Sequence, residues 1–195
     1  MSSLYECEVR FPINDICSFK KRIIELGGKL IYKYEFNDHY FTPSIEVWNP
    51  IEKILRIRHW KYPKNKTVIY FVNNEVVTID KFSFKRSKYK EGKLPLYSGK
   101  LIQCKKLLHD LGFNEQFVLK KQNSQFWDIP KHNFKTIFEY IPNIGWWGEL
   151  EVEGDNTKNA NSMLTNQLEL LNINTKDVSY KPISVIYNEN INNKK

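Results

Sequence analysis

The sequence is poor in cysteine and lacks the patterns in which cysteine or histidine builds a site. Only three of its 195 residues are cysteine, and Cys7, Cys17 and Cys104 are widely separated. An odd, scattered set of thiols excludes a disulfide framework and a zinc knuckle, and it favours a reducing, cytoplasmic compartment. The histidines likewise show no spacing typical of a metal centre.

Long apolar runs are also missing. No stretch approaches the roughly 18 consecutive apolar residues of a membrane-spanning helix, so we expect no membrane partner. Charged residues interrupt the N-terminal segment from Glu6 onwards, which excludes a signal peptide. The segment Gly27-Gly28-Lys29 lacks the spacing of a Walker phosphate loop, so it is predicted to end a helix.

What the chain does have is positive charge and enough apolar surface for a core. Its formal net charge is +8, with 41% hydrophobic and 14% aromatic residues. This composition predicts a folded protein whose partner is an anion, either a nucleic-acid surface or a small polyphosphate. The length suits one domain, which we place at residues 1–183. The Asn/Lys-rich residues 184–195 are predicted to be disordered.

Periodicity predicts an α+β fold. Helical spacing with caps indicates three helices, at about residues 15–27, 98–111 and 157–171. Alternating or β-rich segments indicate eight mostly antiparallel strands, at about residues 4–12, 29–41, 54–58, 67–72, 76–90, 116–129, 134–141 and 146–154. The pair Asn73-Asn74 is a hairpin signal between two of these strands.

The charged faces of these strands sort by sign. Glu6 and Glu8 share one face of the first strand, Glu149 and Glu151 share one face of the last, and arginines alternate in a middle strand. An open sheet with one wet face explains alternation alone, but the opposite faces are bulky, apolar and in need of helical cover. Closing the strands into an eight-stranded antiparallel barrel with the helices outside turns the charges inward. Such a lumen suits a metal–polyphosphate complex.

These charged motifs, in this order and spacing, resemble the CYTH family, or triphosphate tunnel metalloenzymes, which includes class IV adenylate cyclases and thiamine triphosphatases. That family begins with Glu-x-Glu-x-Lys, continues through Leu-Gly-Gly, Asp-x-Tyr-Phe and Leu-Arg-x-Arg segments, and closes with Glu-x-Glu. The matching residues are Glu6, Glu8 and Arg10; Leu26, Gly27 and Gly28; Asp38, Tyr40 and Phe41; Leu55, Arg56 and Arg58; Lys121 and Asn123; Glu139; and Glu149 and Glu151. The resemblance spans about residues 4–180.

Several positions depart from the family pattern. Arg10 replaces a lysine, and no lysine occurs in residues 67–72, where the family has one on its fourth strand. The family's Arg-x-Glu aligns with Arg86 and Lys88, so that a cation replaces a carboxylate, and Asn123 replaces an arginine. These changes leave anion binding in place and weaken metal binding.

The resemblance implies roles for the matched residues. The catalytic and metal-binding carboxylates would be Glu6, Glu8, Glu149 and Glu151, with Glu139 as a further ligand of Mg²⁺ or Mn²⁺. The cations that neutralise the triphosphate would be Arg10, Arg56, Arg58, Arg86, Lys88 and Lys121. Asp38 and Tyr40 would orient the substrate.

The resemblance leaves three functions open. Hydrolysis of a triphosphate, whether a nucleoside triphosphate, thiamine triphosphate or inorganic triphosphate, is favoured because it needs only a held metal and a water. Cyclisation to cyclic AMP and pyrophosphate also needs an adenine pocket, which the sequence does not identify. A catalytically silent nucleotide or polyphosphate binder is the third. An RNA 5′-triphosphate is an additional substrate class, and a monomer or homodimer is expected.

Overall fold

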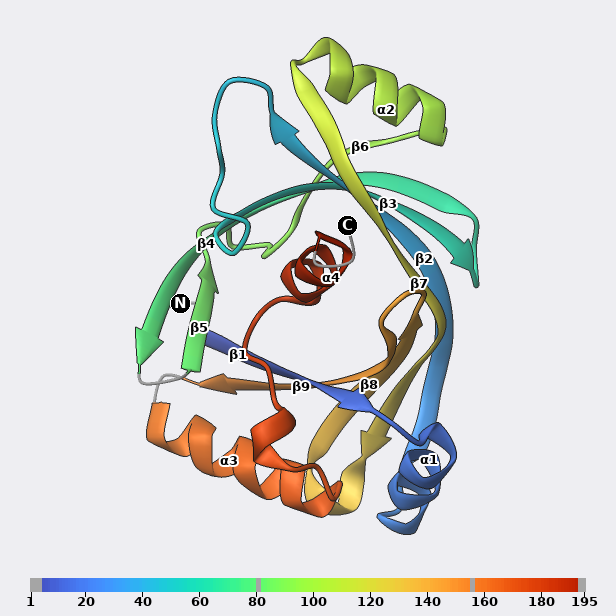
Figure 1. The fold of residues 1–195 in the computed structure, drawn as a ribbon, viewed down its shortest axis with the longest axis vertical. Helices are drawn as coiled ribbons and strands as arrows, with labels where there is room; N and C mark the ends of the chain where they lie inside the picture. The colour runs from blue at the N-terminus through green and yellow to red at the C-terminus, as the bar shows by residue number, and fades with distance from the viewer. Residues whose placement is uncertain (1–4, 80–81, 155–156, 193–195) are drawn as a thin grey trace.

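A computed structural model describes residues 5–79, 82–154 and 157–192 (Figure 1). Within these ranges the fold is α+β, with one antiparallel sheet of nine strands and four α-helices. The strands are β1 (Tyr5–Ile13), β2 (Lys29–Pro43), β3 (Lys53–Tyr62), β4 (Lys66–Ile79), β5 (Phe82–Ser87), β6 (Leu94–Ser98), β7 (Phe113–Ile129), β8 (Phe134–Ile141) and β9 (Gly145–Gly154). The helices are α1 (Ile16–Glu25), α2 (Leu101–Asp110), α3 (Thr157–Leu170) and α4 (Ile183–Asn192).

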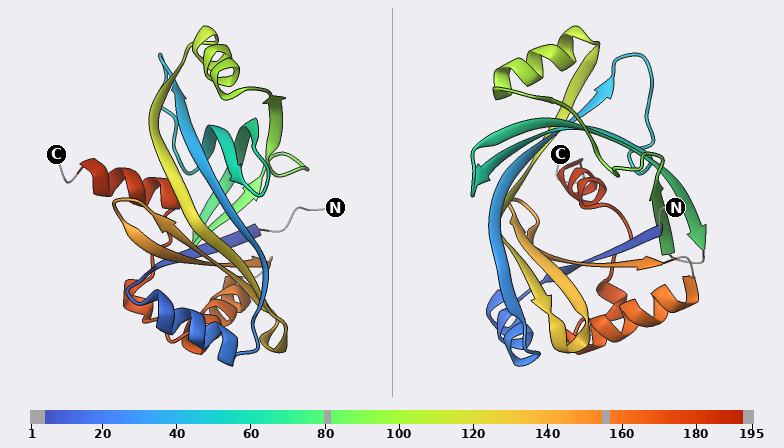
Figure 2. Two further views of the ribbon diagram at one scale, coloured as in Figure 1. Left: turned by 90° about the vertical axis from the view of Figure 1, so that its right-hand side faces the viewer. Right: turned by 180° about the vertical axis from the view of Figure 1, so that it is seen from behind.

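The sheet curls until its strands meet. The strand order is β3-β2-β7-β8-β9-β1-β5-β4-β6, and an additional pairing joins β3 to β4. That pairing runs from Lys53↔Asn73 to Trp60↔Lys66, so eight strands form a ring and β6 adds to β4. Figure 1 looks into this ring of strands, and Figure 2 shows it from the side and from behind. The predicted set of eight strands lacked β6.

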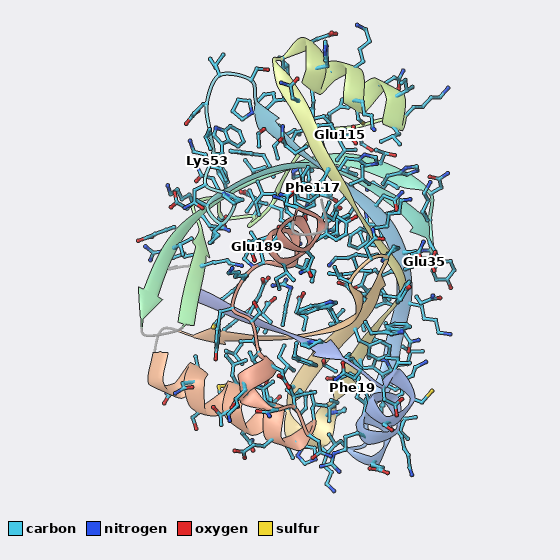
Figure 3. The ribbon with its side chains drawn as sticks, viewed as in Figure 1. Phe19, Glu35, Lys53, Glu115, Phe117 and Glu189 are labelled. Carbon is cyan, nitrogen blue, oxygen red and sulfur yellow. The ribbon has the colours of Figure 1, made fainter. Side chains whose placement is uncertain are left out.

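Alternation along β1 and β9 separates a charged inner face from an apolar outer face. The two strands pair antiparallel, with Glu8 opposite Glu151 and Arg10 opposite Glu149. The intervening side chains Cys7, Val9 and Phe11 point outward, where they are buried against helices α1 and α3. Figure 3 labels Phe19 of α1, which packs edge-on against Phe11 and Phe138 in this layer. Burying the outer faces therefore fixes which side chains face the inside.

Two smaller clusters complete the packing. Helix α2 covers the opposite side of the ring, where Cys104 and Leu108 meet Phe41, Leu55 and Ile57. Helix α4 lies at one end of the ring (Figures 1 and 2). Its apolar residues Ile183, Ile186 and Tyr187 pack on Leu119 and Ile141, with partly buried Phe117 and Tyr40 alongside. Figure 3 shows Phe117 beside this helix.

Two local predictions were wrong. Residues 184–192 were expected to be disordered, but they form most of α4, because Ile183, Ile186, Tyr187 and Ile191 recur at helical spacing and have an apolar surface to cover. Residues 193–195 of that segment lie outside the described ranges. Asn73-Asn74 was expected to turn a hairpin, but β4 continues through it to Ile79, since β3 and then β5 supply partners along its whole length.

Three helix predictions are confirmed to within a few residues. The N-cap of α1 is Asp15, whose carboxylate accepts hydrogen bonds from the backbone N–H groups of Cys17 and Ser18 at 2.9 and 3.2 Å. Gly27 follows this helix with a φ of +81°, which an L side chain rarely adopts.

None of the helices in the described ranges is long and apolar enough to cross a membrane.

We expect Gly148→Ala to lower the free energy of unfolding by about 1–3 kcal/mol, the usual range for overpacking a core. A Cβ at this β9 position would lie 2.1 Å from Cε2 of the fully buried Phe11. Urea denaturation of Gly148→Ala, of Phe11→Leu and of the double variant measures the effect. Because Leu is smaller than Phe and leaves room for the added methyl group, the double variant should lose less stability than the sum of the two single variants. An unchanged urea midpoint for Gly148→Ala would contradict the packing.

Candidate functional site

A cavity of about 410 Å³ occupies the inside of the ring of strands and is called the central cavity below. Its lining combines residues of β1, β2, β3, β4, β5, β7, β8 and β9 with the first residues of α4. Of the residues predicted from the sequence to form the site, ten line it: Glu6, Glu8, Arg10, Tyr40, Arg56, Arg58, Lys121, Glu139, Glu149 and Glu151. Segments more than 100 residues apart therefore converge on one enclosure.

Carboxylates gather where β1 and β9 pair. Oxygens of Glu8, Glu149 and Glu151 lie within 4.8 Å of one another, and so do oxygens of Glu6, Glu151 and Glu153. Glu151 belongs to both sets because it lies between two glutamates on β9 and opposite Glu8 on β1. Glu153 alternates with Glu149 and Glu151 in the sequence but was not among the residues assigned to the site.

This crowding perturbs the ionisation of the carboxylates. Enclosure in the cavity, followed by the charges of Glu8, Glu6 and Glu149, raises the pKa of Glu151 to about 8. Enclosure and the charges of Glu8 and Glu153 also raise the pKa of Glu6. Both pKa shifts therefore reflect first the enclosure of the cluster and then the repulsion between its carboxylates.

Two side chains of the protein neutralise part of this charge. Arg10 spans the two strands, donating to Glu8 at 3.0 Å and to Glu149 at 2.8 Å. Lys85 of β5 donates to the same Glu8 oxygen at 3.1 Å. Burial opposes ionisation of Glu8, but Arg10 and Lys85 outweigh it and hold the pKa of Glu8 far below its usual range. Burial opposes charge on Arg10 too, yet Glu149 and Glu8 raise its pKa further above normal.

Arg56 and Arg58 of β3 and Lys121 of β7 line the cavity and are called the basic wall. The fully buried Asp38 accepts two hydrogen bonds from Arg58, both at 2.7 Å, and its carboxylate lies 3.3 Å from Arg56. Burial disfavours the Asp38 carboxylate, but the charges of Arg58 and Arg56 lower its pKa to about 2. Asp38 does not line the cavity; it fixes two arginines that do. Its predicted contact with substrate is therefore replaced by a positioning role.

Arg56 has spare hydrogen-bonding capacity. Its Nε is buried and has no hydrogen-bond partner among the described residues. A buried donor of this kind is costly when unsatisfied, so an anion in the cavity would supply the missing acceptor.

Glu139 and Lys121 form a second fixed pair on the cavity wall. Lys121 lies 2.6 Å from one Glu139 oxygen, and Tyr34 donates its hydroxyl to the other, also at 2.6 Å. Both residues of the ion pair are buried. Each oxygen of Glu139 already has one of these partners, so a metal bound by Glu139, as the sequence predicted, would share the carboxylate with Lys121 and Tyr34 or replace one of them. Tyr40 also lines the cavity and stacks on Phe117 at 4.8 Å beside α4.

Two predicted phosphate-binding residues lie elsewhere. Arg86 pairs with Glu75 at 3.1 Å and Lys88 is exposed, and neither lines the central cavity. The register of β5 places Lys85 opposite Glu6, so that Lys85 and Ser87 face inward instead. A shift of one residue exchanges the two faces of a strand, and adjacent cations at 85 and 86 concealed this shift in the sequence. Lys93, which precedes β6, also lines the cavity and was missed.

The acidic cluster fits a divalent metal ion. Mg²⁺ and Mn²⁺ prefer carboxylate oxygens, and the Glu8, Glu149 and Glu151 oxygens are close enough together to share one ion. The raised pKa of Glu151 shows the repulsion that such an ion would relieve. Glu6 and Glu153 extend the cluster towards a second position.

No protein-family model matches the sequence, and no curated protein matches it. Solved structures share its fold. A Pyrococcus horikoshii protein is 24% identical, with a TM-score of 0.69 over 91% of this chain and 96% of its own. A candidate adenylate cyclase from Vibrio parahaemolyticus is 12% identical, with a TM-score of 0.70 over 95% and 99%.

A third solved structure is that of a candidate adenylyl cyclase from Hippeastrum with a dominant triphosphatase activity. It is 11% identical, with a TM-score of 0.58 over 91% of this chain and 90% of its own. The predicted resemblance to the CYTH family is confirmed at the level of the fold.

We expect the pKa of Glu151 to make the metal-free protein less stable as pH rises from about 5 to 8. The folded state keeps a proton up to about pH 8 that the unfolded state releases near 4.5, so this contribution to stability declines across that window. His39, whose lowered pKa acts in the opposite direction, is the same in both proteins compared. The difference in unfolding free energy between wild type and Glu151→Gln therefore isolates the effect. A pH-independent difference would contradict it.

We expect Asp38→Asn to cost about 3–5 kcal/mol of stability, the range for breaking a buried ion pair and leaving its partners charged. The substitution preserves the volume of the side chain and removes the charge that holds Arg56 and Arg58. Urea denaturation measures the loss. Glu46→Gln is the control, because Glu46 pairs with Lys53 at an exposed site. Equal effects of the two variants would show that Asp38 does not organise the basic wall.

Proposed function

We propose that the protein is a metal-dependent phosphohydrolase that binds the triphosphate group of its substrate in the central cavity. The observation that carries the proposal is the division of one enclosure by charge. Carboxylates of β1 and β9 lie on one side, and the fixed cations Arg56, Arg58 and Lys121 lie on the other. A triphosphate with a divalent ion has complementary charge to both sides.

The metal would be held by Glu8, Glu149 and Glu151, with Glu6 as a further ligand; Glu139 would join by sharing its carboxylate with Lys121 and Tyr34 or by releasing one of them. When bound, Mg²⁺ or Mn²⁺ would neutralise phosphate charge and activate a water. Binding would also require Glu151 to lose its proton, so metal affinity should weaken below about pH 8.

The basic wall would bind and orient the phosphates. Arg56 and Arg58 are held in place by Asp38, so they need little reorganisation when an anion arrives. The unpartnered Nε of Arg56 would donate to a phosphate oxygen, and Lys121 would offer its remaining donors. Charge that spreads over the phosphoryl oxygens during transfer would be stabilised by this fixed set of cations. Lys93 and Lys85 would add charge on the side of β5 and β6.

Arg10 lies on the acidic side of the site, where it bridges β1 and β9. It contacts Glu8 and Glu149, and its substitution for a lysine gives it two hydrogen-bonding arms. In the hydrolase, Arg10 would turn towards a phosphate when a metal replaces it between the carboxylates.

Two other functions remain as alternatives. Cyclisation of ATP is one, since solved structures of the same fold include a candidate adenylate cyclase. Hydrolysis is preferred because it needs only water as the attacking group, and the Hippeastrum protein has a dominant triphosphatase activity. A silent triphosphate binder is the other, favoured by Arg10 and Lys85, which already neutralise carboxylates that a metal would use.

We expect phosphate release from at least one of ATP, GTP, thiamine triphosphate, inorganic triphosphate and 5′-triphosphorylated RNA, only with Mg²⁺ or Mn²⁺. Glu8→Gln and Glu149→Gln should lower kcat/KM on the order of 10²-fold or more, since loss of groups that merely support metal ligands costs 10–100-fold. Glu46→Gln, far from the cavity lining, should have no effect. Colorimetric phosphate assays and metal titrations measure these outcomes.

The products distinguish the alternatives. Pyrophosphate and cyclic AMP from ATP would identify a cyclase, and tight binding without any product would identify a silent binder. Preferential binding of RNA over mononucleotides, with an affinity that falls steeply as salt rises, would identify an RNA-directed function. If the Glu8→Gln and Glu149→Gln variants released phosphate as fast as the wild type, Glu8 and Glu149 would not be needed for catalysis.

A further inference from the structure

One wall of the central cavity is aromatic. Tyr32, Tyr34 and Phe36 of β2, with Trp60 of β3, line the same cavity as the phosphate-binding cations. Tyr34 stacks on Phe36 with ring centroids 5.6 Å apart, and Trp60 packs edge-on against both. Tyr32 continues the row from Tyr34 at 5.7 Å and contacts Phe126 of β7 at 5.2 Å. These five side chains are called the aromatic wall.

The aromatic wall begins where the phosphates would bind. The guanidinium of Arg58 lies 3.8 Å over the ring of Phe36, and the ammonium of Lys121 lies 5.4 Å from the same ring. From Phe36 the wall runs along alternate residues of β2, each step about 6.7 Å along the strand. A molecule whose phosphates contacted Arg58 and Lys121 could therefore extend along Tyr34 towards Tyr32.

Core packing does not explain the whole wall. In the described part of the chain, none of its five residues belongs to the three hydrophobic clusters that hold the helices to the sheet. Tyr34 and Phe36 are buried, and Tyr34 is anchored by its bond to Glu139. Tyr32, by contrast, is 48% exposed and Trp60 is partly exposed. Their open surfaces border a charged cavity, where water would otherwise cover them.

We propose that Tyr32 and Trp60 bind the flat heteroaromatic base of an organic triphosphate whose phosphates lie on Arg58 and Lys121. This inference rests on the proposed function and narrows its substrate class, because inorganic triphosphate has no group that could contact the wall. A base stacks on aromatic side chains through its π-face, which every nucleobase possesses. Purine nucleotides should bind somewhat more tightly than pyrimidine nucleotides, because their bases cover more of the wall.

Electrostatics and stacking predict opposite preferences, which makes the proposal testable. Inorganic tripolyphosphate carries more charge than the triphosphate of ATP, so the cations alone would bind it more tightly. Contact with the aromatic wall would reverse that order. Isothermal titration with ATP and with inorganic tripolyphosphate, in a chelator so that no metal-dependent turnover occurs, compares the two directly.

We expect the wild-type protein to bind ATP more tightly than inorganic tripolyphosphate. Tyr32→Ala and Trp60→Ala should each weaken ATP binding about 5- to 150-fold, the usual loss when a stacking aromatic is removed. Both should leave tripolyphosphate binding unchanged, which also shows that the cavity is intact. Tyr32→Phe and Trp60→Phe should retain most ATP affinity because they keep an aromatic face. Tyr97→Ala is the control, since Tyr97 is similarly exposed (40%) and does not line the cavity.

Other results would overturn the proposal. Equal or weaker binding of ATP in the wild type, binding of neither ligand, or alanine variants that lose both ligands alike would each show that the wall does not bind a base. The proposed hydrolysis is tested independently of these titrations, by phosphate release in the presence of Mg²⁺ or Mn²⁺. A protein that prefers ATP in the chelator and releases no phosphate with metal would retain the base site and lose the hydrolase function.

Discussion

The structure depends on holding like charges together across two paired strands. Strand β1 places Glu6 and Glu8 beside Glu151 and Glu153 of β9, an arrangement that repels itself in the absence of cations. The outer faces of the same strands carry Cys7, Val9, Phe11, Leu150 and Val152, whose burial against α1 and α3 fixes the register. The free energy gained by burying the outer faces therefore offsets the repulsion between the carboxylates on the inner faces. Arg10 and Lys85 relieve part of that cost, while enclosure and the neighbouring glutamates still raise the pKa of Glu151.

Sequence periodicity predicted the fold well where a strand has one apolar and one charged face. Alternation, the sorting of the charges by sign and the bulky apolar faces opposite predicted an inner face for Glu6, Glu8, Glu149, Glu151, Arg56 and Arg58, and the structure brings these residues into one cavity. Prediction failed on β5, because Lys85 and Arg86 are adjacent cations and the register is set by pairing with Glu6 on a distant strand. It failed on α4, because Asn188, Asn190 and Asn192 alternate with its apolar residues and the Asn/Lys-rich end of the sequence follows, which masked an apolar row that packs on Leu119 and Ile141. Asp38 was identified from the sequence, but its pairing with arginine could be seen only in the structure, because it depends on how β2 and β3 pair.

The fold and the lining of the cavity carry different kinds of information. At 24% identity or less, the similarity to solved structures establishes how the strands are arranged. Within that arrangement, Arg10 bridges carboxylates, Glu139 pairs with Lys121 and accepts a hydrogen bond from Tyr34, and an aromatic row lies on β2. Chemistry follows from these side chains, because the same scaffold can hold different sites.

The position of α4 has a consequence for how molecules travel. Pro182, just before α4, and Ile183 and Ser184 at its start line the cavity, and the apolar face of the helix is packed against Phe117, Leu119 and Ile141 at one end of the ring of strands. A molecule that enters or leaves the cavity by that end must therefore pass the start of α4, so the helix narrows passage at one of the two ends of the ring.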